Sequence, residues 1–460
     1  MNKRKSRKKN AFPPHLAHLN INAAGIDIGS TAHFVAVPED RDKQVVREFK
    51  TFTTDLYELA AWLKECKIET VAMESTGVYW IPLYEILEEK GFQVLLVNAH
   101  HVKNVSGRKS DVLDCQWIQQ LHTYGLLSGA FRPAEEICQL RGYMRQRENL
   151  IRYAAMHVQH MQKALDQMNL RLHNAISDIT GMTGQKILRA IVNGDRDAKE
   201  LAKHRDGRCK NPIEVIEKSL IGNYKSEHVF ALKQALDLYD YYQTKVQECD
   251  MVIEGFLQSI TTAEKSNVEL PKKRKTKSTP KFEVQTYLYK LCGVDLTAID
   301  GVDALSGLKI ISEVGIDMGK WKTEKQFGSW MGLSPGTKIS GGKILKRSSK
   351  SSANRAASIL RLCANALYNS PTALGSFLRR MKSRIGAPKA ITATAYKLAK
   401  IIYRMLKNKI DYRDIGQDYY NQRYQDKLLK GLKHKAASLG YELTQIGSLI
   451  KPNINKLEVS

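Results

Sequence analysis

Hydrophobic and polar positions follow different patterns in successive parts of the chain. Between residues 21 and 133, short apolar runs such as AAGID, HFVAV and FQVLLVNA alternate with segments of helical spacing. One such segment predicts a helix from its N-cap, Thr54, to Cys66. The first runs are separated by short turns, and βαβ-like units follow them. We therefore expect an α/β domain that begins with antiparallel strands.

The pattern changes at Ala134, where apolar residues begin to recur at spacings of three and four as far as Met168. This spacing predicts a long helix with a coiled-coil seam, in which Arg141 and Arg147 occupy seam positions. The seam has no obvious partner of equal length, so we expect it to mediate self-association. The alternative is packing, in pieces, against later helices of the same chain. Those helices are predicted at 185–204, 211–220 and 227–258.

The rest of the chain contains a linker, a helical domain and a charged extension. Residues 262–286 include PKKRKTKSTPKF, which is typical either of a solvated linker or of a flexible arm that contacts nucleic acid. The sequence pattern of residues 287–410 predicts a helical domain. Within it, LTAIDGVDALSGLKIISEVG indicates either a helix-hairpin-helix-like element, which could bind a phosphate, or an ordinary helix pair. We expect residues 1–20 to form a disordered basic arm, and no function is assigned to residues 411–460.

Charge and composition narrow the classes of partner. The chain of 460 residues has 72 Lys+Arg and 47 Asp+Glu, a formal net charge of +25. This excess favours nucleic acid as the partner, with a membrane surface as the rival. No apolar run approaches the ~18 residues that span a bilayer, so we expect no membrane insertion. The seven cysteines are scattered and form no CxxC pair, which favours a reducing cytoplasm over a disulfide scaffold or zinc ribbon.

Four carboxylates are candidate metal ligands. Asp27 interrupts the first apolar strand, Glu74 ends a later one in MESTG, and Asp111 and Asp114 stand three residues apart in KSDVLD. If the last segment is helical, its two acids share a face. Clustered carboxylates bind hard divalent cations, and two Mg²⁺ ions about 4 Å apart could clamp a phosphodiester. The alternative is a scatter of structural acids.

These segments carry a resemblance to a known family. GIDIG, MESTG, KSDVLD and, much later, GLSPGTKISGGK are similar to elements of the transposases of the insertion sequence one-ten family, which are DEDD-type, bridge-RNA-guided recombinases. The resemblance covers most of residues 20–410, with a longer region at 180–285 than compact members have. It implies a RuvC-like, RNase H-fold domain at 21–133. A coiled-coil region at 134–261 and a helical transposase domain at 287–410 would follow.

The resemblance also implies roles for individual residues and partners. The four acids would form the tetrad that binds Mg²⁺, with Mn²⁺ as a substitute. Ser340, five residues after Pro335, would be the nucleophile that joins DNA through a covalent phosphoserine. The implied partners are target DNA, donor DNA and a structured non-coding guide RNA. The implied assembly is a dimer that becomes a tetramer in the synaptic complex, in a prokaryotic cytoplasm. The acidic and serine halves of the site would come from different protomers.

The residues around Ser340 suit phosphoryl transfer. Gly341 and Gly342 leave the backbone open to a phosphate, and nearby cations would stabilise its charge. The candidate nucleic-acid contacts are Lys109, Gly341, Gly342, Lys343, Lys346, Arg347, Lys350 and Arg355. The neighbouring serines at 348, 349, 351 and 352 are expected to form a polar loop and a helix cap.

Two other functions stay open at this point. A metal-dependent nuclease or Holliday-junction-type resolvase would use the acids to activate water and would leave Ser340 structural. A non-catalytic nucleic-acid-binding protein would keep its binding after Asp27→Asn and would never cut a strand.

Overall fold

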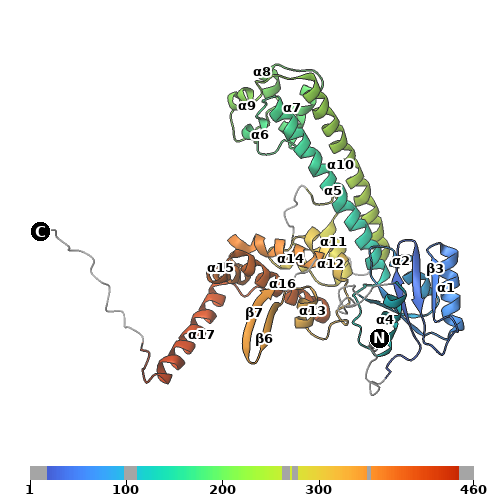
Figure 1. Cartoon of the computed structure of the whole chain (residues 1–460). Coiled ribbons are helices and arrows are strands. Elements are labelled where there is room, and N and C mark those ends of the chain that lie inside the picture. The colour runs from blue at the N-terminus through green and yellow to red at the C-terminus, as the bar shows by residue number, and fades with distance from the viewer. Residues whose placement is uncertain (1–17, 98–110, 262–269, 272–277, 350–353, 445–460) are drawn as a thin grey trace, which may run out of the picture. The chain divides into compact units, whose positions relative to one another are not determined.

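The computed structural model describes the chain except for residues 1–17, 98–110, 262–269, 272–277, 350–353 and 445–460. The chain divides after Arg132 into two compact units (Figure 1). The first unit contains a five-stranded sheet, and the second is mostly helical. Among the helices of the described ranges, none is long and apolar enough to cross a membrane.

The first unit is built on a mixed sheet with the strand order β3-β2-β1-β4-β5. Its strands are β1 (Ala23–Ile28), β2 (Ala32–Ala36), β3 (Val46–Lys50), β4 (Thr70–Glu74) and β5 (Gln93–Val97). The first three pair antiparallel, whereas β4 runs parallel to β1 and β5 parallel to β4. Its helices are α1 (Thr53–Glu65), α2 (Trp80–Glu89) and α4 (Asp111–Thr123). The expected α/β unit with antiparallel first strands is therefore confirmed.

Alternation along the central strands gives the sheet two different faces. Ile26 and Met73 pack in a large core with residues of α1 and α2. Ala72, on the opposite face, packs with Ile118 of α4. One detail of the sequence prediction is wrong: the N-cap of α1 is Phe52, and Thr54 lies within the first helical turn.

Two long helices of the second unit, α5 (Glu135–Gln167) and α10 (Ser226–Ile260), lie side by side (Figure 1). They run antiparallel, because the ring of Tyr153 packs on Tyr242 while that of Tyr143 packs on Phe256. The two helices have 33 and 35 residues. The expectation that the α5 seam lacks a partner of equal length in the chain is therefore wrong. Its apolar stripe packs within the chain, so the stripe gives no argument for self-association.

Four short helices pack at one end of this pair and share its core: α6 (Leu172–Ala175), α7 (Met182–Val192), α8 (Ala198–Ala202) and α9 (Ile213–Ser219). The single helix predicted for 185–204 is in fact α7 followed by α8. Gly194 separates them with φ of 107°, a backbone conformation that glycine adopts without strain.

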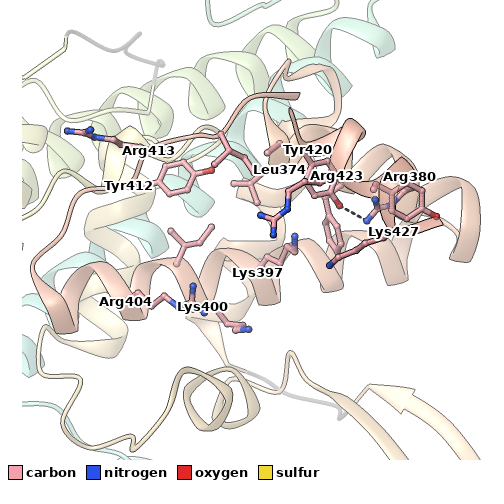
Figure 2. Close-up of a pocket in the computed structure, with 15 residues that line it drawn as sticks. Leu374, Arg380, Lys397, Lys400, Arg404, Tyr412, Arg413, Tyr420, Arg423 and Lys427 are labelled. Carbon is pink, nitrogen blue, oxygen red and sulfur yellow. Dashed lines mark hydrogen bonds between the residues drawn. The ribbon is translucent and has the colours of Figure 1, made fainter. Parts of the chain in front are cut away.

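The C-terminal part of the second unit surrounds one central helix, α16 (Ala387–Asn408), which contacts α13, α14 and α15. The other helices are α11 (Val284–Cys292), α12 (Ala304–Val314), α13 (Glu324–Trp330), α14 (Arg355–Ala366), α15 (Ala373–Ile385) and α17 (Gln417–Ser438). A hairpin of β6 (Pro335–Ser340) and β7 (Lys343–Ser349) interrupts them. The first helix predicted within LTAIDGVDALSGLKIISEVG is only a 3₁₀ turn, Leu296–Ala298. A cavity lies among α15, α16 and α17 (Figure 2).

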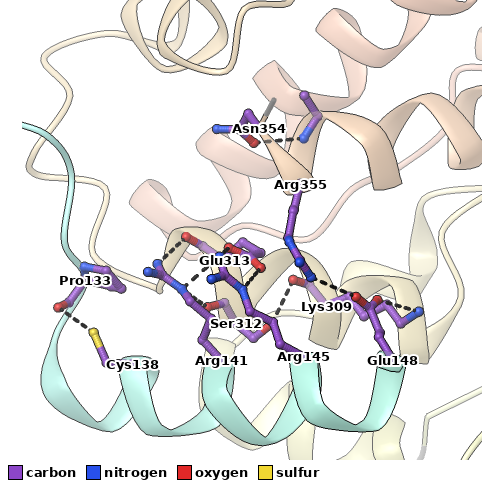
Figure 3. Close-up of polar contacts among 11 residues, drawn as sticks. Pro133, Cys138, Arg141, Arg145, Glu148, Lys309, Ser312, Glu313, Asn354 and Arg355 are labelled. Carbon is purple, nitrogen blue, oxygen red and sulfur yellow. Dashed lines mark hydrogen bonds and ion pairs between the residues drawn. The ribbon is translucent and has the colours of Figure 1, made fainter. Parts of the chain in front are cut away.

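Arginines of α5 hold this helix to the end of α12 (Figure 3). Arg141 donates hydrogen bonds to the carbonyl oxygens of Ser312 at 3.1 Å and Glu313 at 2.8 Å. Arg145 makes two parallel hydrogen bonds to the carboxylate of Glu313, at 2.9 and 2.7 Å. One turn further along, Glu148 pairs with Lys309 at 2.9 Å. The polar seam positions of the sequence are therefore contact points between helices.

Arg147 occupies the other polar seam position and is only 2% exposed. It pairs with Asp250 of α10 at 2.5 Å and donates to the carbonyl oxygen of Ser278 at 2.8 Å.

We expect Asp250→Ala to lower the free energy of unfolding by about 3–5 kcal/mol, because it leaves the buried guanidinium of Arg147 without its counter-charge. Chemical denaturation measures this. Asp240→Ala is the control, since it removes the exposed pair with Arg189 and should cost no more than about 1 kcal/mol. Equal costs would contradict the structural role of Asp250.

Candidate functional site

The register of the sheet brings two of the four predicted acids together. β1 and β4 pair in parallel from Ala23 opposite Thr70 to Ile26 opposite Met73. One further step along both strands sets Asp27 beside Glu74. Ile26 and Met73 belong to the core on the α1 and α2 face, so their neighbours in sequence point to the other face. Asp27 and Glu74 are therefore partly exposed neighbours on the face that α4 covers.

Helix α4 crosses this face so closely that Gly25 has no room for a side chain. A Cβ at Gly25 would lie 2.2 Å from the backbone nitrogen of Gln119 and 2.5 Å from the carbonyl oxygen of Cys115. Toward the helix C-terminus, the ring of His122 lies 2.9 Å from the hydroxyl of Thr70 at the start of β4. The helix therefore runs opposite to β1 and β4. Its first turn lies toward the ends of the strands that carry Asp27 and Glu74.

That first turn contains Asp111 and Asp114. Burial, and to a smaller extent the negative charges of Asp27 and Asp114, raise the pKa of the Cys115 thiol to about 12. The Cys115 thiol is therefore near both carboxylates, that of Asp27 on the sheet and that of Asp114 on the helix. The side chain of Asp111 lies outside the described residues, although its backbone begins α4.

The described acids do not by themselves form a complete set of metal ligands. Among the described side chains, no three from His, Cys, Asp and Glu lie close enough to hold a metal ion. Glu74 accepts a hydrogen bond from the hydroxyl of Thr76 at 2.8 Å. The donor set is nevertheless made of hard carboxylate oxygens, which suit Mg²⁺ and Mn²⁺ and do not suit soft metals.

We expect Gly25→Ala to disturb both the fold and the acids. The added methyl group must push α4 away from β1, which should lower the free energy of unfolding by about 1–3 kcal/mol and displace Asp114 from Asp27. Urea denaturation and strand cleavage per folded molecule measure the two effects. The matched control is Gly142→Ala, at a helical position where a Cβ meets nothing within 4 Å. It should be neutral or stabilise by up to about 1 kcal/mol. Normal cleavage by the Gly25 variant would mean that the packing of α4 does not set the position of the acids.

Ser340 ends β6 and is exposed beside a tight turn. It pairs with Lys343 across that turn, and the two residues between them, Gly341 and Gly342, have φ of 54° and 74°. Two successive left-handed residues are the requirement of a type I′ hairpin turn, which explains this glycine pair without a ligand. The role of this pair as an opening for a phosphate stays a prediction, and the hairpin itself was not predicted.

The expectation for the serines that follow is wrong for those that the structure describes. Ser348 and Ser349 lie in strand β7 instead of a polar loop. The N-cap of α14 is Asn354, whose side chain accepts a hydrogen bond from the backbone of Ala357 at 3.0 Å. Residues 351 and 352 lie outside the described ranges.

The structure describes only some of the predicted basic contacts. Lys343 is exposed next to the turn, while Arg355 pairs with Glu148 of α5 at 3.4 Å. Residues 109 and 350, and the side chains at 346 and 347, lie outside the described set. Asp27, Glu74 and Asp114 belong to the first unit, and Ser340 and Arg355 to the second.

Two family models match separate segments of the chain. Residues 24–170 match the model DEDD_Tnp_IS110, described as "Transposase". Residues 295–377 match a model described as "Transposase IS116/IS110/IS902 family". The first segment contains all four predicted acids and the second contains Ser340. A comparison with curated proteins found no match.

Proposed function

Because this chain belongs to the IS110 family of transposases, we propose that it cuts and rejoins DNA through a phosphoserine intermediate at Ser340, with a divalent metal held by acids of the first unit. The observation that carries the proposal is the register of β1 with β4, which sets Asp27 beside Glu74 on the face that α4 covers. The matched segment has the mixed sheet expected of a RuvC-like domain of the DEDD type.

The carboxylates would serve as metal ligands. Asp27 and Glu74 would bind from the sheet, and Asp111 and Asp114 from the first turn of α4. A bound Mg²⁺ or Mn²⁺ would neutralise charge that develops on the phosphodiester oxygens. Without a cation, carboxylates this near to one another repel both one another and the DNA backbone. The charge of these carboxylates and the family resemblance both support a role for a divalent metal.

Ser340 would supply the covalent step. Its Oγ would bond to phosphorus, its proton would pass to a base, and one deoxyribose oxygen would leave as a free hydroxyl. A hydroxyl from a second strand end would then attack the phosphoserine and release Ser340. One phosphodiester is broken and one is formed, so no water is consumed and no energy source is needed. An exposed serine on a hairpin can reach DNA, but its hydroxyl needs activation.

One observation favours the hydrolytic alternative. The three described acids all lie in the first unit, so a nuclease that activates water there would not need Ser340. The two functions differ in their products, because hydrolysis leaves free ends and never attaches protein to DNA. A non-catalytic binding protein would give neither product.

We propose further that a structured RNA guides the choice of DNA, with the protein working as an oligomer. The support is the family resemblance and the net charge of +25. We expect purified protein to carry a discrete RNA whose affinity falls steeply with salt. The reason is that lysines and arginines that bind RNA phosphates displace the counterions condensed on the RNA. Sequencing the co-purified RNA tests this. A random mixture of cellular RNAs would contradict guided recognition and would leave the phosphoserine chemistry to be tested separately.

A further inference from the structure

The cavity among α15, α16 and α17 has a volume of about 540 Å³ and lies largely beyond the segments that match the family models. Among the described residues, its lining contains seven lysine and arginine side chains and no carboxylate. Two of these cations, Lys400 and Arg404, share an ion pair with the single carboxylate of Glu324 of α13. The other five are Arg380, Lys397, Arg413, Arg423 and Lys427.

Lys397 of α16 is one of these five cations. It is half-buried, and burial together with Arg380 and Lys400 lowers its pKa. Among the described residues, no carboxylate forms an ion pair with it; its ammonium lies 4.0 Å from the ring centre of Phe377. Figure 2 shows Lys397 of α16 and Arg423 of α17 directed into the same space. A desolvated lysine beside further cations is a site that an anion would stabilise.

Aromatic rings line the same cavity. The guanidinium of Arg380 lies 3.8 Å from the ring centre of Tyr424 and 5.0 Å from that of Tyr420, and it also donates to the Tyr420 hydroxyl. Tyr424 remains 40% exposed. Cations that track a phosphate backbone, combined with aromatic rings that stack bases, are the combination used by proteins that bind single-stranded nucleic acid.

We propose that this cavity binds an unpaired nucleotide of a single-stranded nucleic acid, with the phosphate near Lys397 and Arg423 and the base on Tyr424. The volume lies in the range of small-ligand sites and suits one nucleotide rather than a duplex. The rings make a base a better occupant than an acidic peptide, which would use only the cations. The inference rests on the proposed function only in that the ligand is nucleic acid, and it needs no strand cutting.

The test is fluorescence anisotropy on the full-length protein, stripped of bound nucleic acid and kept in EDTA to prevent cleavage. The probes are a single-stranded RNA, a single-stranded DNA of the same sequence and the corresponding DNA duplex. Lys397→Gln with Arg423→Gln should weaken single-strand binding about tenfold and lower the salt slope by about 1.4, the value for two lost phosphate contacts. Duplex binding should change less than about twofold, since a cavity of this volume suits one nucleotide rather than a duplex.

The matched control removes two charges from the same helix without touching the cavity. Lys430→Gln with Lys433→Gln, both exposed on α17, should change single-strand binding less than about twofold. Tyr424→Leu should weaken it about tenfold while Tyr424→Phe keeps it, because stacking needs the ring and not the hydroxyl. If the double variant of Lys397 fails to fold, Arg423→Gln alone carries the test, because Arg423 is exposed.

Loss of both RNA and DNA binding would support a site for the shared chemistry, and loss of RNA binding alone would restrict it to RNA. Equal losses in the cavity and control variants, or a loss confined to the duplex, would overturn the proposal. Failure of the proposed recombination chemistry would be seen separately, because the binding assay in EDTA requires no strand cutting.

Discussion

Ser340→Ala abolishes strand joining and the covalent protein–DNA adduct if the serine is the nucleophile. Alanine has no oxygen to bond to phosphorus, so no residual covalent route remains. The fold should be unaffected, because Ser340 is exposed and Gly341 and Gly342 set the turn beside it. Recombination assays with Mg²⁺, followed by denaturing electrophoresis before and after protease treatment, measure joining and the adduct together. Peptide mapping should place the DNA on Ser340.

Two variants make this result specific. Ser358→Ala removes an exposed hydroxyl from α14 of the same unit and should recombine normally. Ser340→Cys keeps a nucleophilic atom at the site and should retain a trace of adduct. An adduct mapped to another residue, or normal joining by Ser340→Ala, would remove the serine from the mechanism. Free cut ends without an adduct in the wild type would instead favour metal-activated water.

Much of the first unit could be predicted because two local signals agree there. Alternating apolar runs indicate strands, and helical spacing between them indicates a mixed sheet with helices on its faces. The pairing of Asp27 with Glu74 could not be predicted in the same way. It depends on the register of β1 with β4, which the sequence between these strands does not determine. Gly25 carried a local signal, a glycine within a strand, which marks a close backbone approach.

The second unit shows which information was missing. The apolar stripe of α5 was recognised, but its partner α10 lies far along the chain, so a local pattern could not identify it. The pair Gly341-Gly342 between strand-like segments is a strong hairpin signal. The interpretation of the same glycines as an opening for a phosphate obscured that signal. The cavity cations come from three helices and a connecting segment, and only folding brings them together.

Asp27→Asn should reduce strand cleavage at least about a thousandfold. The change keeps the size of the side chain but removes one charge from the metal ligands. Metal stabilisation of the transition state contributes several kcal/mol, and each 1.36 kcal/mol corresponds to a factor of ten. Cleavage of labelled DNA in Mg²⁺ measures this. Asp40→Asn is the control, since its carboxylate lies 73% exposed outside the site, and it should cleave normally.

The melting temperature separates a metal role for Asp27 from a purely structural one. Without divalent cations, Asp27→Asn should melt no lower than the wild type, because it relieves repulsion from the carboxylates of Glu74 and Asp114. Added Mg²⁺ should stabilise the wild type, because a ligand that binds only the folded state raises its stability. The melting temperature of the variant should rise much less. With enough Mg²⁺ the wild type should therefore melt at a higher temperature than the variant. A structural Asp27 would give the opposite pattern: a lower melting temperature at every Mg²⁺ concentration and the same gain from the cation in both proteins.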